Sequence, residues 1–248
     1  MNPNQKEKII ANTKKEFPNG INSFGTDAMR FTFCSLASGS RDINFDLKRL
    51  EGYRNFCNKL WNAANFIKIQ CKGYDNKKVL SKNLEDFWIY DEFNKTAENF
   101  SKHIESYRFD LATQVTYDFF WEKFCDWYIE FCKIKLNDPK VTQPEKNKVK
   151  ASLIDLMHKS LILFHPILPF ITEEIWQEFK PFHKSKLLSI SQEKFPEVRK
   201  ISRDFSKIEA LKESISGIRN IRSEMLISHK FKIDILCDSK GPLFKLLE

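Results

Sequence analysis

The longest regular pattern of apolar and polar positions runs from about residue 45 to residue 70. The segment contains one glycine and no proline, and its apolar side chains recur at helical spacing: Leu50, Tyr53, Cys57, Leu60, Trp61, Ala64 and Ile67. This period is typical of an α-helix that buries one face. The pattern therefore predicts a long helix with a single apolar side.

Similar patterns elsewhere predict further helices, over about 4–16, 26–37, 83–106, 110–136, 145–164 and 203–225. Thr26 or Asp27 is expected to cap the second of these, and Thr172 a short helix that follows the breaks at Pro166 and Pro169. Alternation over 230–237 predicts a strand. Long helices joined by short loops are typical of an all-α bundle.

Composition narrows the chemistry that this bundle supports. The chain has 248 residues and only 7 glycines, and it contains neither a GxGxxG nor a GxxxxGK[ST] string. No GxSxG or HExxH string is present either, and the five histidines lie far apart in the sequence. We therefore predict no catalytic residue and no metal ligand in this chain.

Six cysteines without a CxxC pair indicate buried thiols and a reducing, cytoplasmic compartment. The N-terminal residues lack the apolar core of a signal peptide. The longest apolar run, 161–171, is interrupted by two prolines and falls short of the ~20 residues that a membrane span needs. We expect no membrane partner.

The net charge of +8 suits an anionic partner, and the 45–70 helix offers a place for one. Opposite its apolar face, helical geometry lines up a polar stripe of Lys48, Asn55, Lys59, Asn62 and Phe66. Lysines would contact phosphates, amides would read base edges, and Phe66 would stack on an unpaired base. The alternative is that Phe66 packs under a neighbouring helix and the lysines are ordinary solvated charges.

Specific strings then point to a family. Residues 24–33 (FGTDAMRFTF), 39–46 (GSRDINFD) and 48–64 (KRLEGYRNFCNKLWNAA) closely resemble the valyl-tRNA synthetase family, also called valine–tRNA ligases. The strings FCDWY at 124–128, HPILPFITEEIW at 165–176 and IRNIRSEM at 218–225 resemble the same family in the same order. RDIN and NFCNKLWN distinguish the valyl enzymes from the related isoleucyl and leucyl enzymes.

The resemblance implies an all-α fold, the anticodon-binding helical bundle of class Ia aminoacyl-tRNA synthetases. Residues 1–44 resemble the end of the catalytic and stem-contact region, and 45–200 the anticodon-binding helical bundle. Residues 201–248 resemble the start of a truncated C-terminal α/β piece. In this family the bundle holds the anticodon arm, so the resemblance implies tRNA-binding roles for Lys48, Asn55, Lys59, Asn62, Phe66, Arg41 and Asn44.

The family attaches valine to tRNA(Val), using ATP and Mg²⁺. Its HIGH and KMSKS catalytic motifs and its editing domain are missing here, so we expect the chain to bind the anticodon arm without a cofactor and to be inactive alone. Its expected partners are tRNA(Val) and the remainder of the synthetase, in a family that is usually monomeric. The alternative is a free-standing helical RNA-binding or interaction module derived from a synthetase.

Overall fold

The computed structural model describes residues 3–20, 23–39, 43, 45–74, 79–228 and 230–234. The helical elements follow one another in the order α1 (Pro3–Glu16), α2 (Thr26–Leu36), α3 (Leu47–Gln70), α4 (Leu84–Glu105), α5 (Phe109–Asp118), η1 (Phe119–Tyr128), α6 (Ile129–Asn137), α7 (Gln143–Phe164), α8 (Pro169–His183), η2 (Ile190–Gln192) and α9 (Ser206–Glu224).

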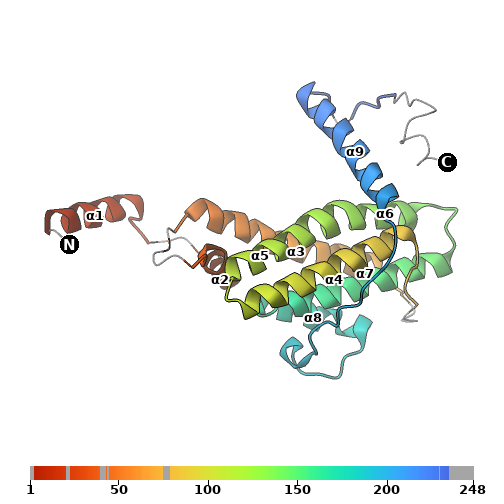
Figure 1. Ribbon diagram of the computed structural model, residues 1–248, viewed down its shortest axis with the longest axis horizontal. Helices are drawn as coiled ribbons and strands as arrows, with labels where there is room; N and C mark the ends of the chain where they lie inside the picture. The colour runs from red at the N-terminus through yellow and green to blue at the C-terminus, as the bar shows by residue number, and fades with distance from the viewer. Residues whose placement is uncertain are drawn as a thin grey trace.

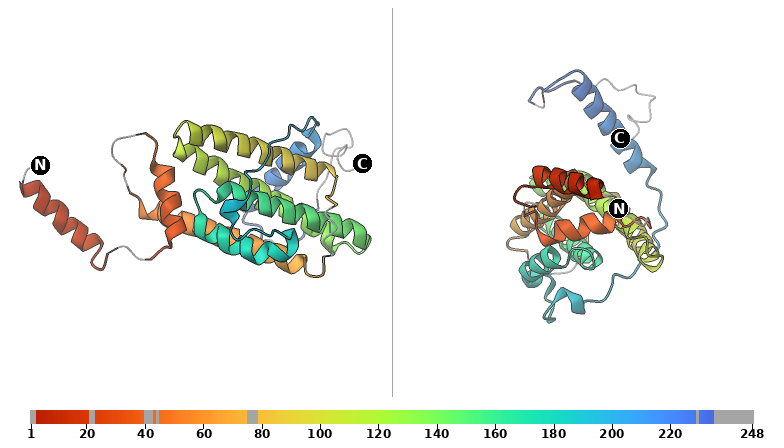
Figure 2. Two further views of the ribbon diagram at one scale, coloured as in Figure 1. Left: turned by 90° about the horizontal axis from the view of Figure 1, so that it is seen from below. Right: turned by 90° about the vertical axis from the view of Figure 1, so that its left-hand side faces the viewer.

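Helices α3 to α8 lie side by side in an elongated bundle, and α2 packs across one end of it (Figures 1 and 2). Helix α1 stands apart beyond that end, and α9 projects from the bundle (Figure 1) and contacts α4. The all-α prediction is confirmed, as are the expected helices at these positions. None of the described helices is both long and apolar enough to cross a membrane.

The expected strand over 230–237 is wrong for its described part, because residues 230–234 form a turn, a bend and irregular chain. Residues 235–237 lie outside the described residues. The side chains of residues 231–234 are all exposed. The alternation of apolar and polar residues there therefore does not correspond to one buried and one exposed face. The proposed domain boundaries at 44 and 200 stay predictions.

Aromatic side chains fill the middle of the bundle. Phe120 is fully buried, and its ring centroid lies 5.2 Å from Phe124, 5.6 Å from Phe164 and 6.0 Å from Phe56. One ring thereby joins η1, α7 and α3. Phenylalanine, of which the chain has 23, supplies many of the buried core residues, and each buried ring removes a large apolar area from water.

The segment predicted as one helix over 110–136 is continuous, but its centre is wound differently. Residues Phe119–Tyr128 form a π-helix, in which each N–H bonds to the carbonyl five residues earlier. The Ile129 N–H, for example, donates to the Phe124 carbonyl. A π-helix therefore changes which side chains share a face, and an α-helical reading of the sequence misplaces them.

Asp27 caps a different helix from the one that the sequence indicates. Its carboxylate is buried and accepts the N–H groups of Phe170 (3.4 Å) and Ile171 (2.6 Å), in the first turn of α8. Helix α2 itself begins after Gly25, without a side-chain cap. Arg30, one turn further along α2, donates to the Pro166 and Ile167 carbonyls. These two side chains fasten α2 to the α7–α8 junction.

Thr172 does not cap α8 either, because that helix already begins at Pro169. The Thr172 hydroxyl donates to the Leu168 carbonyl (2.7 Å) and lies 2.8 Å from Nδ1 of His165. Since the hydroxyl proton is used, Nδ1–H of His165 is the donor. Burial lowers the pKa of His165, which favours this neutral ring at the end of α7.

The Asp27 contact yields a prediction for stability. We expect Asp27→Ala to lower the free energy of unfolding by about 1–3 kcal/mol, because two N–H groups at the start of α8 lose their acceptor. Urea denaturation measures the change. Thr26→Ala, at the exposed neighbouring position, serves as the control and should change the free energy by less than about 0.5 kcal/mol. Equal effects of the two substitutions would contradict the assigned role of Asp27.

Candidate nucleic-acid interface

Helix α3 carries the polar stripe that the sequence indicates. Asp46 caps its N-terminus by accepting the Lys48 N–H at 2.9 Å. The residues that α3 buries are Leu50, Phe56, Leu60, Ala63, Ala64 and Ile67. Phe56 and Ala63 were not among the residues expected on the apolar face, so the buried face is wider on the side toward Lys59 and Phe66.

Three residues of the stripe are exposed: Lys48, Asn55 and Asn62. They follow one another at intervals of seven residues, about two helical turns, and so line one side of α3. A rigid helix that presents two amides and an ammonium to solvent has the donors and acceptors for phosphates and base edges. Their contact with RNA stays a prediction.

Lys59 is held by contacts from another helix. Its Nζ lies 2.7 Å from Oδ1 of Asp126 and 4.1 Å from the centroid of the Trp121 ring. Both partners belong to η1. An ion pair and a cation–π contact thus fix the Lys59 ammonium. The helical pattern alone predicts instead a phosphate contact or a solvated charge at this position.

Phe66 is half-buried and packs against the bundle core. Lys133 of α6 places its Nζ 5.2 Å from the centroid of the Phe66 ring. The structure therefore shows the packing that was the alternative to base stacking, and the ring keeps only part of its surface toward solvent. Stacking of a base on Phe66 stays a prediction.

The other two predicted tRNA-binding residues, Arg41 and Asn44, lie outside the described residues. Trp121 and Asp126, which hold Lys59, are not among the site residues that the sequence predicts. No local pattern points to them, because Asp126 is 67 residues away from Lys59 in the chain and meets it only through packing of η1 on α3.

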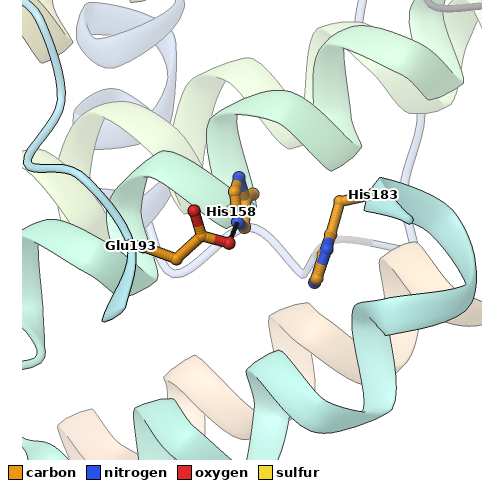
Figure 3. A group of neighbouring side chains, drawn as sticks. All are labelled: His158, His183 and Glu193. Atoms are coloured by element: carbon orange, nitrogen blue, oxygen red, sulfur yellow. Dashed lines mark hydrogen bonds and ion pairs between the residues drawn. The ribbon is translucent and has the colours of Figure 1, made fainter. Parts of the chain in front are cut away.

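The structure brings together two histidines that are distant in the sequence. His158 of α7 and His183 at the end of α8 stack with ring centroids 4.4 Å apart, and Glu193 lies 3.3 Å from Nε2 of His158 (Figure 3). These three side chains form the group of potential metal ligands found among the described residues.

Hydrogen bonds to neighbours outside the group already occupy at least three of the four histidine ring nitrogens. Nδ1 of His183 accepts the Ser185 N–H (3.2 Å), and its Nε2 lies 3.3 Å from the Trp176 carbonyl. The Trp176 indole N–H donates to Nε2 of His158 at 3.2 Å. A metal ion would have to displace these bonds. The geometry therefore favours a structural role, in which the three side chains hold the segment after α8 against α7.

The cysteine prediction holds where the structure describes these residues. Cys71, Cys125 and Cys132 are buried and Cys34 and Cys57 half-buried, all as free thiols. Burial raises the pKa of Cys57, Cys71 and Cys125 to about 12. The thiols are therefore protonated at neutral pH, which makes them poor nucleophiles and poor metal ligands. Cys237 lies outside the described residues.

Comparison with known families identifies the class of protein. The family model described as the anticodon-binding domain of tRNA ligase matches residues 86–237, more than half of the chain. The chain therefore belongs to the family of anticodon-binding domains of tRNA ligases. The match begins inside α4, so α3 precedes the matched residues.

Three curated relatives of this chain are all valine–tRNA ligases. The chain is 43% identical to that of Coxiella burnetii over 95% of its length, and 43% identical to that of Acinetobacter baylyi over all of it. It is 41% identical to the valine–tRNA ligase of Psychrobacter arcticus over 95% of its length. The chain spans about a quarter of the length of these relatives (26%, 27% and 25%).

A solved structure shares the fold. It is LeuRS in a ternary complex of LeuRS, tRNA and LeuAMS from Agrobacterium radiobacter, with a TM-score of 0.50 over 81% of this chain and 26% of that one. The sequence identity is 14%. The likeness agrees with the predicted helical-bundle fold.

Phe66→Ala separates the two roles of this ring. Because the ring packs on the core, we expect the substitution to lower the free energy of unfolding by about 2–3 kcal/mol, below the 3–5 kcal/mol of a fully buried phenylalanine. Urea denaturation measures this free energy. RNA affinity is measured separately, at a temperature where the substituted and unsubstituted chains are both folded. A loss of about 1–3 kcal/mol in RNA affinity would show base stacking, whereas unchanged affinity would leave the ring a core residue.

Proposed function

We propose that this chain is the part of a valine–tRNA ligase that binds the anticodon arm of tRNA(Val). The observation that carries the proposal is its identity of 41–43% with valine–tRNA ligases over at least 95% of the chain. The family match to anticodon-binding domains of tRNA ligases over residues 86–237 supports an RNA contact by this bundle.

The surface of α3 supplies the chemistry for the proposed contact. Lys48 is exposed. Among the described residues no carboxylate forms an ion pair with its ammonium, which is therefore available to a phosphate. Asn55 and Asn62 offer both donors and acceptors to base edges. Sequence-specific recognition of RNA uses unpaired bases in loops, and an anticodon presents such bases.

The complete enzyme would attach valine to tRNA(Val) with ATP and Mg²⁺. The described thiols are protonated and buried or half-buried, and the described histidines of the His158–His183 pair are hydrogen-bonded, so we assign no step of that reaction to them. In this proposal the chain holds the RNA, the remainder of the synthetase performs the chemistry, and the assembly acts as a monomer in the cytoplasm.

Binding to two RNAs tests the proposal. We expect the 248-residue chain to bind tRNA(Val) more tightly than the same tRNA with a changed anticodon, by about tenfold per altered base that is read, which corresponds to the loss of one hydrogen bond to a charged group or its equivalent. Fluorescence anisotropy at several salt concentrations measures both affinities. Equal affinities at every salt concentration would leave only nonspecific charge attraction, and the proposal would be wrong.

Lys48→Ala tests the phosphate contact. We expect it to weaken binding of both RNAs by the same factor and to lower the slope of log K against log salt by about one unit. Lys68→Ala is the matched control, because Lys68 lies on the opposite side of α3 and pairs with Glu178 at 2.7 Å. A slope that is unchanged in Lys48→Ala, or that changes equally in Lys68→Ala, would exclude Lys48 as a phosphate contact.

A further inference from the structure

The ion pair between α3 and η1 distinguishes Lys59 from the other lysine of the stripe. The side chain of Lys59 is 26% exposed and that of Asp126 is 43% exposed, with 2.7 Å between Nζ and Oδ1. The pair therefore stands at the surface, beside Asn55 and Asn62, and its net charge is close to zero. An ammonium neutralised in this way adds little to the attraction of a phosphate backbone.

The π-helical winding of η1 makes this arrangement possible. Trp121 and Asp126 are five residues apart and would point about 140° away from each other on an α-helix. A π-helix, with its bonds to the fifth residue, places them on successive turns of the same face. Lys59 consequently meets the Trp121 ring at 4.1 Å and the Asp126 carboxylate at once.

These two contacts leave the ammonium with a definite orientation. A lysine ammonium has three N–H donors; one points to Asp126 and the Trp121 ring covers another side of the group. The remaining donor can serve a ligand without the large loss of rotamer freedom that a lysine side chain normally suffers on binding. Such a fixed donor is suited to a single acceptor atom, such as a carbonyl oxygen or ring nitrogen of an unpaired base.

We propose that Asp126 and Trp121 are positioning residues that make Lys59 a reader of a base edge rather than a phosphate anchor. The inference rests on the proposed function, because it assumes that RNA binds along α3. Lys48 and Lys59, which belong to the same stripe, then have different roles in binding. Lys48 supplies affinity that depends on salt, and Lys59 supplies discrimination between RNAs.

Asp126→Asn tests this assignment, because the amide keeps the shape of the side chain and removes its charge. The released Lys59 should act as an additional cation, so the salt slope should rise by about one unit for both RNAs. The preference for tRNA(Val) over the tRNA with a changed anticodon should fall by about tenfold, as expected when a donor to a base is no longer held in place. Anisotropy titrations at several salt concentrations give both quantities, and thermal unfolding confirms that the variant is folded.

Two further variants make the result specific. Lys59→Ala should lose the same preference without lowering the salt slope, and Asp126→Asn added to Lys59→Ala should change the preference no further. Glu130→Gln is the matched control, since Glu130 lies one turn beyond Asp126 and pairs with Lys133 at 2.7 Å. It should alter the salt slope while the preference stays as in the unsubstituted chain.

The outcomes separate the inference from the function on which it rests. If the unsubstituted chain does not distinguish the two RNAs, the proposed function is wrong and the inference falls with it. If that chain does distinguish them, and Asp126→Asn distinguishes them equally well or behaves like Glu130→Gln, only the inference is overturned. A salt slope that falls by about one unit in Lys59→Ala would likewise show Lys59 to be a phosphate anchor.

Discussion

The burial of aromatic rings around Phe120 is the constraint on which the rest of the bundle depends. Phe120 touches rings from α3, η1 and α7 and has no exposed surface. Rings of this size pack to the density of an organic crystal and tolerate little displacement. The positions of three helices relative to one another are therefore set together, and with them the direction in which the outer face of each helix points.

The same core explains the unusual winding next to the candidate interface. Phe119, Phe120, Phe124 and Tyr128 are all buried within ten residues, and Phe119 stacks on Phe124 with centroids 6.3 Å apart. On an α-helix those two rings would diverge by about 140°. The π-helix brings them to one side, and it also brings Trp121 and Asp126 together on the outside. Core packing and the placement of Lys59 thus share one physical origin.

Part of the candidate interface could be foreseen from α3 alone, because helical periodicity fixes which side chains share a face. Lys48, Asn55 and Asn62 are exposed along one side, as this periodicity predicts. Phe66 and Lys59 differ, since neighbours from η1 and α6 cover one edge of the stripe. Whether a side chain at the edge of a helix face is solvated or packed depends on the helix beside it, and a pattern within one helix does not contain that information.

The sequence by itself determined the helices, the all-α class and the family, because these follow from local periodicity and from strings that are specific to that family. Only the tertiary structure decided that Asp27 caps α8, that Lys59 pairs with Asp126 and that His158 stacks on His183. Each of these contacts joins residues far apart in the chain. Their geometry depends on how several helices pack at once, and the aromatic core fixes that packing.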